Sequence, residues 1–115
     1  PYFNMVQVVL TDQDVRKLLK TGTKIVIQLR KQLGNDVVIL GPVLPKIARI
    51  NNFYRAQIII KYKVSPNINE VLKNIYQDFN DEIQIAIDKN PSKTFSFSTK
   101  SLSRYFTIKF VHLGT

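Results

Sequence analysis

Residues 53–64 read FYRAQIIIKYKV, a run in which two kinds of side chain alternate along the chain. Successive side chains of a β-strand point to opposite faces. One set is largely apolar: Tyr54, Ala56, Ile58, Ile60 and Tyr62. The other set carries most of the charge: Phe53, Arg55, Gln57, Ile59, Lys61 and Lys63. The run is therefore predicted to form a long strand with one face in the core and one basic face.

Two other segments have the three- and four-residue spacing of apolar side chains that is typical of amphipathic helices. The first follows Thr11, a candidate N-cap, and is predicted to stop at Gly34. Gly22 falls on its apolar stripe, so this helix is predicted either to bend there or to pack closely on a neighbour. The second covers residues 68–79 and begins with a capping pattern at Asn67.

Further strands are predicted at residues 2–10, 37–40 and 82–88, where short apolar runs lack a helical period. Asn51-Asn52 is a turn pair that tolerates positive φ, which makes residues 46–64 a hairpin. The resulting order is strand, helix, strand, strand, helix, strand. It predicts an α+β, split-βαβ (ferredoxin-like) fold, with two helices on one face of an antiparallel sheet and the other face open.

Charge is the first indication of function. The 115 residues suit a single domain, and 17 Lys and Arg against 8 Asp and Glu give a net charge of +9. Residues 16–63 contain eleven of the basic residues and a single acidic residue, Asp36. Such segregation favours a polyanion-binding surface. A solvated helix face is the alternative reading for the lysines of the first helix.

The chain lacks the residues that several functions require. The chain has no Cys and one His, His112, which excludes disulfides, thiol catalysis and multi-His metal sites in this segment. No phosphate-loop or hydrolase motif occurs, so the chain is expected to be non-catalytic and to bind no cofactor or metal. No apolar run is long enough to span a membrane, and the protein is expected to be cytoplasmic with no membrane partner.

The most informative stretch is residues 41–61, GPVLPKIARINNFYRAQIIIK. It predicts a Pro-bounded loop that leads into the hairpin, with bases interleaved among aromatic side chains. A guanidinium group can form paired hydrogen bonds with a phosphate, and an aromatic ring can stack on a base. The alternative is that the rings fill the core and the charges only solvate an edge strand.

This stretch closely resembles the C-terminal domain of primosomal protein N′, the bacterial replication restart helicase family. The matching residues are Gly41-Pro42, Ile47-Ala48-Arg49, Tyr54-Arg55, Gln57 and Lys61, with Ile85–Pro91 similar to the closing strand. The resemblance covers residues 1–91 and implies a fold similar to small-subunit ribosomal protein ten. Residues 92–115 have no counterpart and are treated as an extension, strand-like at Tyr105–Leu113. The opening Pro1-Tyr2 resembles a domain junction, so the chain is expected to be part of a longer protein.

The resemblance implies that the parent protein is an ATP-dependent DNA helicase that uses ATP, magnesium and zinc through parts outside this chain. It also implies branched or single-stranded DNA as the ligand of this domain, with single-strand-binding protein and other primosome proteins as partners.

Three functional hypotheses follow. The first is a DNA-binding domain in which Tyr54 or Phe53 stacks on a nucleobase. Five basic side chains would contact phosphates: Lys46, Arg49, Arg55, Lys61 and Lys63. Four lysines of the first helix would add secondary contacts: Lys17, Lys20, Lys24 and Lys31. The second is a protein-interaction module that receives the acidic tail of single-strand-binding protein or docks on the helicase core. The third is a ribosomal or RNA-binding relative of the same fold.

Overall fold

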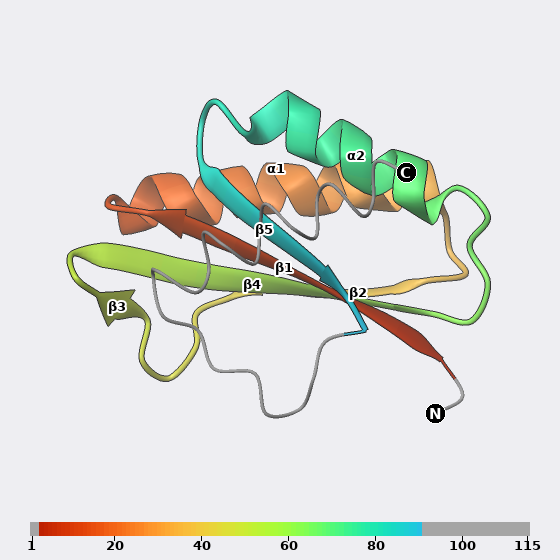
Figure 1. Cartoon of the computed structure of the whole chain (residues 1–115), viewed down its shortest axis with the longest axis horizontal. Helices are drawn as coiled ribbons and strands as arrows, with labels where there is room; N and C mark the ends of the chain where they lie inside the picture. Colours follow the sequence, from red (N-terminus) through yellow and green to blue (C-terminus); the bar gives the residue numbers. More distant parts are fainter. Residues whose placement is uncertain (1–2, 91–115) are drawn as a thin grey trace.

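The computed structural model describes residues 3–90. Two helices and five strands follow one another in an α+β arrangement: β1 (Asn4–Asp12), α1 (Val15–Leu33), β2 (Val38–Val43), β3 (Arg49–Ile50), β4 (Phe53–Tyr62), α2 (Ile68–Phe79) and β5 (Gln84–Lys89). The antiparallel sheet has the order β2-β4-β1-β5, and the short β3 pairs with β4. Both helices lie on one face of this sheet (Figure 1). The predicted split-βαβ fold is confirmed; the predicted extension after residue 91 lies outside the described residues.

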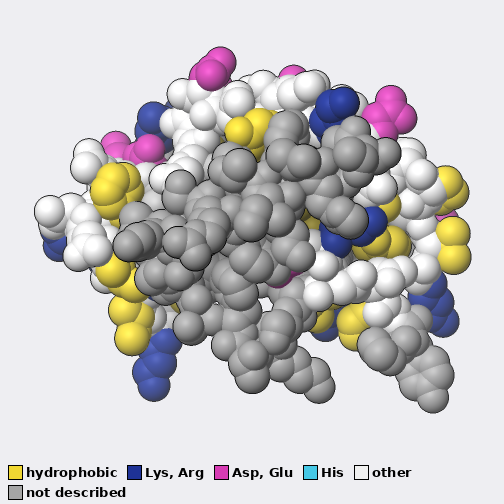
Figure 2. Space-filling view, in the orientation of Figure 1, with side chains coloured by type: hydrophobic (Ala, Val, Ile, Leu, Met, Phe, Trp, Pro, Cys, Tyr) yellow, Lys and Arg dark blue, Asp and Glu magenta, His cyan; other side chains and the backbone are white. Residues whose placement is uncertain are grey.

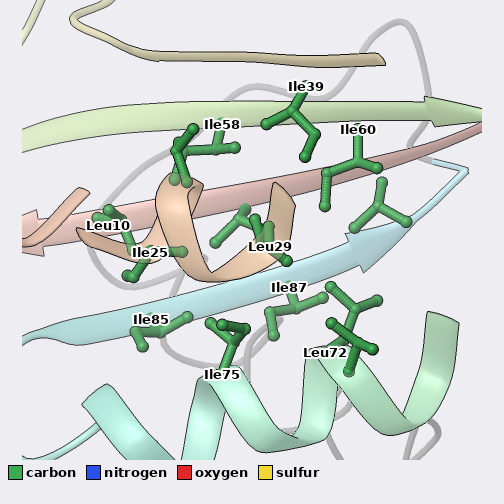
Figure 3. Packing of buried hydrophobic residues seen from close by; sticks show 14 of the residues in the cluster. Leu10, Ile25, Leu29, Ile39, Ile58, Ile60, Leu72, Ile75, Ile85 and Ile87 are labelled. Carbon is green, nitrogen blue, oxygen red and sulfur yellow. The ribbon is translucent and has the colours of Figure 1, made fainter. Parts of the chain in front are cut away.

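The core lies between the helices and one face of the sheet, and its side chains come from both (Figure 3). The alternation predicted for residues 53–64 is observed, since Ala56, Ile58 and Ile60 are fully buried. Other wholly buried side chains in the cluster include Leu10, Leu18, Ile25, Leu29, Leu72, Ile75 and Ile85. The opposite side chains of β4 therefore belong to the sheet face that carries no helix.

The start of α1 differs from the prediction. Thr11 is a strand residue, 2% exposed, because β1 continues to Asp12 through pairing with β4 and β5. Asp14 is the N-cap instead, and its Oδ1 accepts hydrogen bonds from the backbone N–H groups of Arg16 (2.9 Å) and Lys17 (3.3 Å). Pairing along β1 thus moves the helix start three residues beyond the predicted cap.

Close packing, rather than a bend, explains Gly22. A Cβ at this position would lie 2.9 Å from the Pro42 Cβ and 3.3 Å from the Leu10 Cδ1. α1 therefore sits directly on β1 and β2 where it crosses them. The helix ends as predicted, at Gly34, whose φ is 78° and whose N–H donates to the Arg30 carbonyl at 3.1 Å.

Two Asn sites set the remaining connections. Asn51 and Asn52 both have positive φ, 53° and 67°, which confirms the predicted two-residue turn between β3 and β4. Asn67 precedes α2, but its side chain makes no cap hydrogen bond. Its Nδ2 donates instead to the Gln32 carbonyl at 3.3 Å, which ties the start of α2 to the end of α1.

Candidate nucleic-acid interface

The bases predicted for DNA contact fall into three groups on the folded chain. The hairpin group contains Lys46 and Arg49, together with Tyr54. The open-face group lies on or beside the helix-free face of the sheet: Arg55, Lys61 and Lys63. The helix group lies on α1: Lys17, Lys20, Lys24 and Lys31. Figure 2 shows Lys and Arg side chains at several separate places around one face rather than in a single patch.

In the hairpin group, Arg49 pairs with Tyr54 across the β3–β4 ladder. The Arg49 guanidinium carbon lies 5.7 Å from the Tyr54 ring centroid, and Nη2 donates to Asn52 Oδ1 at 2.8 Å. Tyr54 is half-buried and packs against the core, whereas Lys46 and Arg49 are exposed. Tyr54 thus orients Arg49, and one face of its ring is already occupied.

Arg55 of the open-face group is only 8% exposed. Its Nη2 donates to the Ile47 carbonyl at 3.4 Å, and its backbone N–H donates to the Ala48 carbonyl at 2.8 Å. Burial lowers the pKa of the guanidinium from its usual value, although an arginine remains charged at neutral pH. Arg55 therefore anchors the loop before β3 to β4.

Lys61 and Lys63 lie at the other end of β4. Lys61 is half-buried between Met5 of β1 and Val38 of β2, and its Nζ is 5.3 Å from the centroid of the Phe3 ring. Lys63 is exposed just beyond the strand. Seven residue steps separate Tyr54 from Lys61, which is about 23 Å along a strand. The hairpin group and these two lysines therefore form two sites rather than one.

The helix group projects from the side of α1 opposite the core. Lys17 Nζ lies 3.8 Å from Asp12 Oδ1, an exposed ion pair of the kind that contributes little to stability. Lys20, Lys24 and Lys31 are exposed, and none of them has a carboxylate partner within residues 3–90. Three cations on one helix face thus stay available to an external anion.

A depression of about 420 Å³ lies within this helix face. Five side chains line it: Lys24, Ile27, Gln28, Lys31 and Phe79. Ile27 is 50% exposed although it is apolar, and Gln28 Nε2 donates to Asp78 Oδ2 at 2.9 Å, which connects α1 to α2. A basic rim around an apolar floor suits a ligand with both an anionic and an apolar group.

Acidic side chains gather at the end of the sheet where α2 leads into β5. Asp12, Asp81 and Glu82 line a depression of about 350 Å³ beside Tyr76 and Phe53. Asp12 pairs with Tyr54 in the β1–β4 ladder, so these acids are near the hairpin group. In the part of the chain from residue 3 to 90, no cluster of three or more His, Cys, Asp or Glu could hold a metal ion. These acids and the hairpin group therefore lie at the same end of the sheet.

The structure adds two residues that sequence reasoning did not single out. Phe3 is 41% exposed beside Lys61, and Ile27 is half-exposed beside Lys24 and Lys31. Phe3 could have been noticed from the strand alternation, because it precedes Met5 by two residues and so falls on the helix-free face. Ile27 is the apolar residue of α1 that lies off the core stripe.

Comparison with known proteins decides the family. The model of the primosomal protein N C-terminal domain matches residues 1–92. The chain belongs to this family. It is also 38% identical over 96 residues to the replication restart protein PriA of Bacillus subtilis (strain 168), a match that takes in 79% of this chain and 12% of that protein. The chain thus spans about an eighth of the length of this relative.

A solved structure is similar in fold alone. The de novo designed protein Foldit4 superposes with a TM-score of 0.61, at 12% identity, over 79% of this chain and 99% of the designed one. This likeness supports the split-βαβ architecture and carries nothing about function. Among residues 3–90, neither helix is long and apolar enough to cross a membrane.

Proposed function

We propose that this primosomal protein N C-terminal domain is a non-catalytic DNA-binding domain that acts in replication restart and helps to recognise branched DNA. Its membership of the family and its relative's name support the restart role. The parent protein would be the ATP-dependent helicase, and this domain would supply contacts to the DNA.

The observation that carries the proposal is the availability of the cations. Lys20, Lys24 and Lys31 are exposed without a carboxylate partner in residues 3–90, and Arg49 donates to a neutral amide. Side chains of this kind neutralise phosphates and release counterions, which supplies sequence-independent affinity. Because Lys20, Lys24, Lys31 and Arg49 have no carboxylate partner within residues 3–90, their charge is presented to partners.

The separation of the three groups favours branched over linear DNA. A linear duplex offers phosphates along one axis, whereas a fork offers them on arms that diverge. The helix group lies on α1, while Lys61 lies about 23 Å along β4 from Tyr54 of the hairpin group, and Lys63 lies farther along. A domain with cations on different faces can touch two arms at once. Contacts would be to the backbone, because nothing in residues 3–90 resembles a helix presented for reading bases.

The salt dependence of binding tests this function. The 115-residue chain is titrated into a fluorescently labelled fork, and the association constant is measured over a series of salt concentrations. Each phosphate neutralised contributes about −0.9 to the slope of log K against log salt. A slope of about −3 or steeper is expected from the exposed cations. A slope near zero would contradict phosphate binding.

One observation favours a second candidate, a peptide-binding role. The depression at Lys24, Ile27 and Lys31 has an apolar floor and a basic rim. It fits an acidic peptide with an apolar side chain, such as the acidic tail of single-strand-binding protein. Replacing Ile27 with Ser separates the two functions. It should weaken a peptide of this kind and leave fork binding intact, because phosphates need the lysines and not the apolar floor.

A further inference from the structure

The end of the sheet near Phe3 combines an exposed ring with two cations. Phe3 immediately precedes β1, and strand alternation places it on the same helix-free face as Met5, which pairs with Lys61. Asn4 pairs with Tyr62, and its Nδ2 donates to the Lys63 carbonyl at 3.3 Å. The ladder between β1 and β4 therefore holds Phe3 beside both lysines.

The ring of Phe3 contacts a neighbouring cation but is not buried. Lys61 Nζ lies 5.3 Å from the ring centroid, a cation–π contact that restrains the ring. Phe3 nevertheless stays 41% exposed. Val38, which pairs with Lys61 on its other side, is 54% exposed and extends the apolar surface across β2. A ring that is partly restrained and exposed on an open face suits stacking, because part of its rotamer freedom is lost before binding.

The charges around the ring suit a nucleic-acid strand. Lys61 and Lys63 follow the face of the sheet beside the ring, where they can pair with the phosphates that flank a stacked base. Asp88, an acid on this face, lies on β5, is 4% exposed and is separated from β4 by β1. Proteins that bind single strands combine cations that follow the backbone with rings on which bases stack.

We propose that Phe3, supported by Lys61 and Lys63, is a stacking site for an unpaired base of single-stranded DNA. The bases of a duplex stack on one another, so only an unpaired nucleotide offers a free face to Phe3. This site deepens the proposed function and rests on it. It assigns single-strand contact to one end of the sheet and leaves duplex contact to the helix group.

Two DNA substrates and two variants test the site. One substrate is a single-stranded oligonucleotide with 2-aminopurine, whose fluorescence responds to stacking; the other is a fork whose arms are fully duplex. Phe3→Leu keeps an apolar side chain over the Lys61 stem but removes the aromatic face. It should weaken single-strand binding about tenfold and abolish the stacking signal. Phe3→Trp should restore both, and the duplex-armed fork should bind all three proteins equally.

The outcomes separate this proposal from the function it rests on. The stacking site alone would be overturned if Phe3→Leu bound the single strand as tightly as the wild-type chain does, while all three proteins still bound the duplex-armed fork. An equal loss on both substrates, or failure of Phe3→Trp to restore the signal, would also overturn it, since either result assigns Phe3 a structural role. If the wild-type chain binds neither DNA, the DNA-binding function itself fails. Thermal unfolding followed by circular dichroism checks that each variant is folded.

Discussion

Gly22 of α1 and Pro42 of β2 are in van der Waals contact, so closely that a Cβ on Gly22 would lie 2.9 Å from the Pro42 Cβ. Real Cβ contacts this short require the neighbours to shift. Gly22 is also buried, and the Leu10 Cδ1 of β1 would lie 3.3 Å from the same Cβ. This contact sets how near α1 can approach the sheet.

Replacing Gly22 with Ala is expected to destabilise the fold. Overpacking costs about 1–3 kcal/mol, and the better helix propensity of Ala returns about 1 kcal/mol, which leaves a net loss of about 1 kcal/mol. Urea unfolding measures the difference. Thr23→Ala is the control, because Thr23 is exposed on the same turn and its loss should change stability by less than about 0.5 kcal/mol. A stabilised Gly22→Ala would show that the helix and sheet are not in contact here.

The N-cap of α1 gives a second stability prediction. Asp14 accepts hydrogen bonds from two N–H groups that have no partner in the helix, so Asp14→Ala should cost about 1 kcal/mol. Asp14→Asn keeps the side-chain oxygen and should cost much less. Urea unfolding of the two variants checks the assignment. Equal losses would mean that charge, and not the cap hydrogen bonds, matters at this position.

Tyr62 predicts how stability depends on pH. Burial raises the pKa of the Tyr62 phenol above its usual value near 10, because the ionised form is poorly solvated in the folded chain. The stability that the neutral phenol contributes is fully present below the pKa it has in the unfolded chain. It is lost as pH rises through the pKa it has in the folded chain. The free energy of unfolding should therefore fall as pH rises above about 10, and less so in Tyr62→Phe. Parallel pH profiles for the two proteins would contradict this assignment.

The helix group can be tested with variants of equal charge. Lys24→Ala with Lys31→Ala removes two cations from the helix group, and Lys73→Ala with Lys89→Ala removes two from α2 and β5. The first pair should reduce the salt slope of fork binding by about 2, since each phosphate contact contributes about 0.9. The second pair should leave the slope close to that of the wild-type chain. Equal effects of the two pairs would assign binding to net charge alone.

The order and type of the elements could be predicted from sequence because each has a strong local pattern. The alternation at residues 53–64 and the apolar stripe around Gly22 are patterns of residues that lie close together in sequence. The structure confirms both predictions made from them. The N-cap was misplaced at Thr11 because β1 is lengthened by pairing with distant strands. The residues around Thr11 contain no information about that long-range pairing.

The candidate site was less accessible to sequence reasoning. Lysine positions on α1 follow directly from helical spacing. Arg55 could not be separated from the exposed bases, because its burial depends on a loop that returns over β4. The grouping of Phe3 with Lys61 depends on the register of two strands 58 positions apart in the chain. Contacts across the sheet, rather than residue types, decide which bases act together.

The most direct measurement of the central claim compares two DNA molecules of equal length and charge. The 115-residue chain is titrated against a fork and against a linear duplex at one low and one higher salt concentration, with binding followed by fluorescence anisotropy. The account predicts tighter binding to the fork at both concentrations and a steep loss of affinity with salt. Equal affinity for the fork and the linear duplex at low salt would contradict recognition of branched DNA.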